Sequence, residues 1–259
     1  MENGEEKSAE NPDYNTTMDG LFVKAKEKDE FEYVSSLLRI RGTEGPGWDP
    51  LVESWDAIQD YLRLCQTPFR DITRFRLFLL IYSHITEIDT VYDMLANMLR
   101  TIKGDRCSMI PFDDYAKATK KRVGYPAEKI AALKEMESAL GLDLLGKLFD
   151  LFFDNDIRNA FYHSNYSIFE NEFRYRKKYA VAVPIPVVVG KIEKAINFYL
   201  SFMGLYQDHV RSYKTSKIIK GRIAPNGGWL DVELLVDKER GVYGFRNPPS
   251  NAQASELGV

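Results

Sequence analysis

The chain has 259 residues, of which 44% are hydrophobic and 13% aromatic, so a wholly disordered protein is excluded. Its formal net charge of −3 excludes a protein that coats nucleic acid through overall positive charge, and any contact with RNA must be local. Two cysteines, Cys65 and Cys107, and three histidines argue against a disulfide framework and a metal centre. We expect no metal and no other cofactor.

The N-terminal segment has no basic start followed by an apolar stretch, so no secretory signal peptide is expected. The longest apolar run, from Leu77 to Tyr82, is far shorter than the roughly 20 residues that cross a bilayer. We therefore expect a cytoplasmic protein with reduced cysteines and no membrane partner.

Composition divides the chain into four expected segments. Residues 1–20 are acidic and polar, and residues 248–259 contain almost no large apolar side chains, so both are expected to be disordered tails. Residues 21–213 are expected to form a helical domain, and residues 214–247 a C-terminal extension that contains β-strands. The expected fold class is mainly α.

Apolar residues that recur every three or four positions predict a series of helices. The expected helices cover residues 50–64, 71–103, 127–140, 143–163 and 188–213. In the second of these, the apolar seam runs unbroken from Phe78 to Ile102, and Gly104 follows where a helix-ending glycine belongs. Such a seam predicts one long core helix or a helix that pairs with a partner.

Two regions favour β-structure. The stretches between Ile168 and Pro186 predict a β-hairpin or an extended arm between the last two helices. Near the C-terminus, strands are expected over residues 229–236 and 242–245, joined by a turn at residues 237–241.

The segment from Arg158 to His163 reads Arg-Asn-Ala-Phe-Tyr-His and lies at the end of the expected helix 143–163. On that helix Asp156, Asn159 and His163 form a polar line beside an apolar face, whereas Arg158 points to the other side, one turn after Asp154. Burying polar groups is unfavourable unless they are paired, so the line either pairs internally or serves a ligand. The simpler alternative is a histidine at a helix end next to an Arg158–Asp154 pair.

In its context this segment resembles the motif of the HEPN superfamily, in which an arginine, commonly followed by a polar residue, precedes a histidine by four to six intervening residues. Arg158, Asn159 and His163 match that motif, and the order of the expected helices over residues 50–213 is similar to that of the family. The resemblance implies a HEPN-like helical bundle with the β-hairpin as an insertion and the C-terminal strands outside the family core. It also implies a homodimer with a composite site.

The chemistry that the resemblance implies is RNA cleavage without a metal. A histidine that titrates near neutrality can accept the proton of a ribose 2′-OH or donate one to the 5′-oxygen. A guanidinium binds phosphate through two donors and offsets the negative charge that grows on it. We therefore take Arg158, Asn159 and His163 as candidate catalytic residues. One protomer offers one such histidine, so two facing motifs suit the two proton transfers.

Basic and aromatic residues alternate between Arg174 and Tyr179, a pattern suited to phosphate contact and base stacking. The alternative is a solvated hairpin whose cations balance Glu170 and Glu172. The candidate substrate-binding residues are Tyr162, Arg174, Arg176, Lys177 and Lys178.

His84 and Glu87 lie three residues apart on the expected long helix. A carboxylate-bridged di-metal site would need this pair twice, and no second copy exists. We expect the two side chains to pair with each other or to line the same cleft as His163.

Two functions are carried forward. The first is a metal-independent endoribonuclease or RNA-processing protein of HEPN type that acts as a homodimer, with RNA as its substrate. The second is a catalytically inactive HEPN-like module that binds a protein or a nucleotide in defence or regulation; the sequence does not identify the partner protein. A purely structural helical protein is the third reading.

Overall fold

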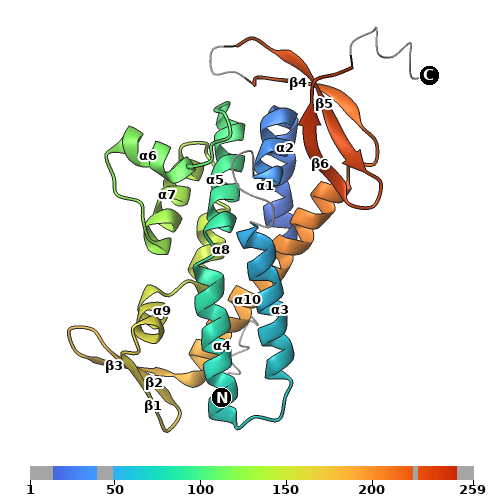
Figure 1. Cartoon of the computed structure of the whole chain (residues 1–259). Helices are drawn as coiled ribbons and strands as arrows, with labels where there is room; N and C mark the ends of the chain where they lie inside the picture. The colour runs from blue at the N-terminus through green and yellow to red at the C-terminus, as the bar shows by residue number, and fades with distance from the viewer. Residues whose placement is uncertain (1–13, 40–48, 224–226, 250–259) are drawn as a thin grey trace, which may run out of the picture.

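The computed structural model describes residues 14–39, 49–223 and 227–249, and within these ranges the chain is mainly helical with two small antiparallel sheets (Figure 1). The helices are α1 (Tyr14–Lys28), α2 (Glu30–Leu38), α3 (Pro50–Cys65), α4 (Asp71–Thr86), α5 (Asp89–Lys103), α6 (Pro111–Thr119), α7 (Pro126–Ser138), α8 (Leu145–Phe152), α9 (Asn155–Tyr162) and α10 (Ile185–Arg211). The strands are β1 (Tyr166–Phe169), β2 (Glu172–Arg176), β3 (Ala180–Pro184), β4 (Lys217–Gly221), β5 (Leu230–Asp237) and β6 (Gly241–Arg246). The mainly helical class is confirmed.

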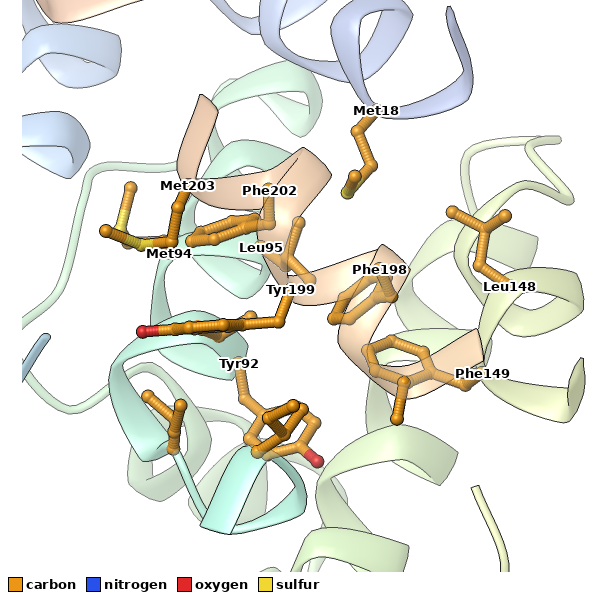
Figure 2. Packing of buried hydrophobic residues seen from close by; sticks show 14 of the residues in the cluster. Met18, Tyr92, Met94, Leu95, Leu148, Phe149, Phe198, Tyr199, Phe202 and Met203 are labelled. Atoms are coloured by element: carbon orange, nitrogen blue, oxygen red, sulfur yellow. The ribbon is translucent and has the colours of Figure 1, made fainter. Parts of the chain in front are cut away.

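The core forms around α10, which contacts α1, α4 and α8. Figure 2 shows Phe198, Tyr199 and Phe202 of α10 lying between residues of α5, α8 and α1. The rings of Phe149 and Phe198 are 5.3 Å apart between centres, and those of Tyr92 and Phe149 are 5.7 Å apart and nearly parallel. Large rings buried in this way contribute much of the free energy of folding because they remove the most apolar area from water.

The single long helix expected over residues 71–103 is wrong, because two helices, α4 and α5, occupy that range. The chain leaves helical geometry at Ile88, whose φ of −72° and ψ of 90° are extended. The carbonyl of Thr86, which the break deprives of its helical partner, accepts a hydrogen bond of 2.9 Å from the hydroxyl of Tyr92. The apolar seam continues across the break, so its spacing could not reveal it. Gly104 ends α5 with a φ of 94°, as expected.

The helix expected over residues 143–163 is also two helices, α8 and α9. The carboxylate of Asp154 accepts hydrogen bonds from the backbone N–H groups of Asp156 and Ile157, at 3.1 and 3.2 Å, and so begins α9. The buried hydroxyl of Tyr82 on α4 donates to the carbonyl of Phe152 at 3.0 Å and accepts from the N–H of Asp154 at 2.8 Å. Tyr82 therefore fixes the break, and with it the start of α9, to α4.

The disordered tail expected over residues 1–20 is wrong from residue 14 onward. Helix α1 begins at Tyr14, and Tyr14 and Met18 are buried in the core, with exposed fractions of 6% and 0%. Their apolar stripe is spread among polar residues, so average composition hid it. Residues 1–13 and 250–259 of the two expected tails lie outside the described residues.

The first sheet has the order β1-β2-β3, so the expected hairpin is a three-stranded meander. Phe173, at the centre of β2, is fully buried and packs edge-on against Phe75 of α4, with 6.5 Å between ring centres. This contact attaches the sheet to the helical core below α9 in Figure 1. The two expected C-terminal strands are confirmed as β5 and β6, and β4, which was not expected, pairs with β5 to complete a second sheet.

His209 of α10 joins the two N-terminal helices. Its Nδ1 lies 2.6 Å from the hydroxyl of Tyr33 on α2, and its Nε2 lies 2.8 Å from a carboxylate oxygen of Asp19 on α1. Burial raises the pKa of Tyr33 far above its usual value, so the hydroxyl keeps its proton. Both ring nitrogens of His209 are therefore occupied, one by the Tyr33 hydroxyl and one by the Asp19 carboxylate.

Replacing Tyr82 with Phe is expected to lower the free energy of unfolding by about 2 kcal/mol, because the change leaves the carbonyl of Phe152 and the N–H of Asp154 without their partner. Urea unfolding followed by circular dichroism measures the loss. Tyr243→Phe is the control, since this side chain is 60% exposed, and a change below about 0.5 kcal/mol is expected there. Equal, small effects of both substitutions would show that Tyr82 does not fix the break.

Candidate functional site

Helix α9 carries the Arg158–His163 segment and packs against the end of α4. Ile157 and Ala160 are its buried residues and face the core. Lys191 of α10 adds an ion pair of 3.5 Å to Asp154, the residue that begins the helix. The N-terminal end of α9 is thus held by both α4 and α10, and its C-terminal end leads outward to β1.

The side chain of Arg158 reaches from α9 to the end of α4 and is only 13% exposed. One terminal nitrogen of the guanidinium, Nη2, forms an ion pair with Glu87, and the other, Nη1, donates a 2.7 Å hydrogen bond to the side-chain oxygen of Asn159. The guanidinium carbon lies 5.3 Å from the centre of the Tyr162 ring, within the range of a cation–π contact. Burial lowers the pKa of Arg158, yet an arginine stays charged at neutral pH.

Two further residues surround this group. His84 lies one turn before Glu87, its Nε2 is buried without a hydrogen-bond partner in the described part of the chain, and burial lowers its pKa. The ring of Tyr61 on α3 meets the His84 ring edge-on at 6.1 Å. Burial and then the neighbouring Tyr61 raise the pKa of Tyr162, while Arg158 lowers it. His84 is therefore neutral at physiological pH, and Tyr162 keeps its proton.

His163 ends α9 and stands apart from Arg158. Its side chain is exposed, and within residues 14–39, 49–223 and 227–249 the imidazole has no hydrogen-bond or ion-pair partner. Its backbone N–H donates to the carbonyl of Asn159 at 3.0 Å, so the residue still closes the last turn of the helix. The structure brings Arg158, Asn159 and Tyr162 together, but it does not join His163 to them within one protomer.

The polar line of Asp156, Asn159 and His163 does not pair internally. Asp156 binds Lys177 of the β2–β3 loop at 2.7 Å, and Asn159 binds Arg158. The Arg158–Asp154 side-chain pair of the simpler alternative is also absent from the described contacts, because Asp154 caps α9 and binds Lys191. Of the three residues of the line, Asp156 alone binds another element through its side chain in the described part of the chain.

The expected substrate-binding cations of the first sheet divide into two pairs. Arg174 binds Glu172 at 2.6 Å and stacks on Phe169, and Lys177 binds Asp156. For these two the solvated, charge-balanced hairpin describes the structure better than an RNA surface does. Arg176 and Lys178 are exposed and have no carboxylate partner in the described residues.

The backbone at Arg176 is hydrogen-bonded to the segment that follows α9. Asn165, two residues after His163, donates from its side chain to the carbonyl of Arg176 at 3.3 Å. The ring of Tyr162 is 49% exposed, although Arg158 stacks on it. The exposed ring of Tyr162, the free imidazole of His163 and the backbone of Arg176 therefore belong to neighbouring segments.

Glu87 is the site residue whose role the sequence did not show. It was expected to pair with His84 or to line the cleft of His163, whereas it forms an ion pair with Arg158. The two residues are 71 positions apart in the sequence, so no local spacing could join them. The break after α4 places Glu87 at the end of that helix, where it meets Arg158.

No group of three or more histidine, cysteine or carboxylate side chains in the described ranges is arranged to hold a metal ion. Among the described helices, none is both long and apolar enough to span a membrane. No family model, no curated protein and no solved structure matches this chain.

Arg158→Ala is expected to lower the free energy of unfolding by about 2 kcal/mol, because it strips the partly buried Glu87 of its partner and removes the packing on Tyr162. The control is Arg63→Ala, since that arginine binds Asp60 on the exposed face of α3 and about 0.5 kcal/mol or less is expected from its loss. Chemical denaturation at pH 7 measures both. The role assigned to Arg158 fails if the two variants lose equal, small amounts of stability.

Proposed function

We propose that the helical part of this chain is a HEPN-like bundle and that the protein is a metal-independent endoribonuclease or RNA-processing protein of HEPN type. The observation that supports this is that α9 carries a paired arginine and, at its end, an unpaired histidine. Arg158, Asn159 and Tyr162 are held rigidly against α4, while His163 remains exposed and unpaired at the end of the same helix. A cleavage site needs both a fixed cation and a free imidazole.

In the proposed reaction the ribose 2′-oxygen attacks the adjacent phosphorus and the 5′-oxygen leaves. The products are a 2′,3′-cyclic phosphate and a free 5′-OH. His163 accepts the proton of the 2′-OH, and the imidazole that protonates the leaving 5′-oxygen comes from a second copy of the chain. The other two histidines do not serve, because both ring nitrogens of His209 are occupied and Nε2 of His84 is buried.

Arg158 and Asn159 are the proposed phosphate ligands, with a charged donor and an amide side by side. Tyr162 supplies an exposed ring on which a base stacks, and Arg176 and Lys178 bind flanking phosphates. Since the overall charge is negative, this small cationic surface carries the affinity for RNA and makes it salt-dependent.

A second candidate function has its own support. The guanidinium of Arg158 is already paired with Glu87 and with Asn159, which is the arrangement of a structural contact between helices. In this case the chain is a HEPN-like module without catalytic activity. It binds a protein or a nucleotide through the exposed Tyr162, Arg176 and Lys178.

Incubating the protein with structured RNA in EDTA separates the two functions. The wild type is expected to produce fragments that end in a 2′,3′-cyclic phosphate, and His163→Ala is expected to reduce the rate at least about 100-fold, the range for loss of a general acid–base group. Lys238→Ala is the matched control on the remote second sheet and should cleave at the wild-type rate. Fragments are sized on gels and their ends are identified by mass spectrometry.

Absence of cleavage by the wild type, or equal cleavage by wild type and His163→Ala, would exclude the enzymatic proposal. RNA binding that is preserved in His163→Ala and lost in Tyr162→Ala would then support the non-catalytic module.

A further inference from the structure

Glu87 supplies the negative charge that pairs with Arg158. It is the first residue after α4, with φ and ψ of −105° and −1°, and it precedes the extended Ile88. Its side chain is 31% exposed, whereas that of its partner Arg158 is 13% exposed. The oxygen of Glu87 that contacts Arg158, Oε1, is itself buried, so the carboxylate covers the guanidinium at Nη2.

The guanidinium has little capacity left for a ligand. Nη2 contacts Glu87 and Nη1 contacts Asn159. The guanidinium also lies over the ring of Tyr162. Nε of Arg158 is buried without a hydrogen-bond partner in the described residues. Nη2, a terminal nitrogen to which a phosphate would bind, is therefore already occupied by the negative carboxylate of Glu87.

Carboxylate and phosphate oxygens both accept from guanidinium N–H groups, so Glu87 and a phosphate would compete for Nη2 of Arg158. Glu87 lies outside both α4 and α5, and its side chain can turn away without breaking a helix. Asn159 and Tyr162 would then remain to hold the guanidinium in place for the phosphate.

From this geometry, and resting on the proposed RNA-binding function of the site, we propose that Glu87 is an autoinhibitory residue. It occupies the phosphate position on Arg158, and an RNA phosphate binds there by displacing it. Affinity for RNA in the resting protein is consequently held below the affinity that Arg158 would provide alone. The alternative is an ion pair that only joins α9 to α4.

The test compares wild type, Glu87→Gln and Glu233→Gln. The glutamine keeps the size and an acceptor oxygen but removes the charge. Glu233 is the matched control, because it forms an ion pair with Arg246 at 2.8 Å on the second sheet, away from α9. Binding of a 2′-O-methyl RNA oligonucleotide, which cannot be cleaved, is measured by fluorescence anisotropy at fixed salt, and binding of inorganic pyrophosphate by calorimetry.

Glu87→Gln is expected to bind both probes about tenfold more tightly, because a like charge is removed beside the phosphate position. Glu233→Gln should match the wild type, and the double variant Glu87→Gln/Arg158→Gln should lose the gain. Unchanged or weaker binding by a folded Glu87→Gln protein would overturn the inference. Loss of the folded state in both Glu87→Gln and Glu87→Ala would overturn it too, since the pair would then be needed for structure.

Failure of this inference is distinguishable from failure of the proposed function. If the wild type cleaves RNA and Glu87→Gln neither binds more tightly nor cleaves faster, only the autoinhibitory role is lost. If no variant cleaves RNA but Glu87→Gln gains affinity for pyrophosphate, the anion site stands and the enzymatic proposal is withdrawn.

Discussion

The hydroxyl of Tyr82 is buried in the helical core and must find partners there, since an unpaired polar group in the interior is strongly unfavourable. It finds them at the break between α8 and α9, where it bridges the carbonyl of Phe152 and the N–H of Asp154. The direction of α9 follows from this bridge and from the Asp154 cap. With α9 so directed, Arg158 reaches Glu87 at the end of α4, and the chain after His163 runs into the first sheet.

The side chains of α9 consequently fall into two groups, one held by mutual contacts and one without partners in the described residues. Arg158, Asn159 and Tyr162 restrain one another, and Glu87 completes the group. His163 lies at the end of the helix, where its ring is exposed and its backbone alone is bonded. A paired cation and a free imidazole on the same helix are compatible with phosphate chemistry, and the Glu87 carboxylate on Arg158 is the feature that opposes it.

The spacing of apolar residues predicted most of the helices because it shows which faces are apolar. It does not show where the helix axis changes direction. It therefore ran across the breaks at Ile88 and Asp154, although Asp154 is a good cap whose signal was present in the sequence. Average composition also concealed α1, whose buried Met18 lies among polar neighbours. The motif residues could be found from their order alone. Their partner Glu87 could not, because a contact between distant segments depends on tertiary packing.

The most direct test of the account is nuclear magnetic resonance of the imidazole rings, since the chain has three histidines. A 2′-O-methyl RNA oligonucleotide is titrated into the protein at constant pH and salt, and the ring signals of each histidine are followed. The account predicts that the signals of His163 shift with the bound fraction while those of His209, which is held between Tyr33 and Asp19, stay unchanged. Signals of His163 that do not move when the protein is saturated with RNA would contradict it.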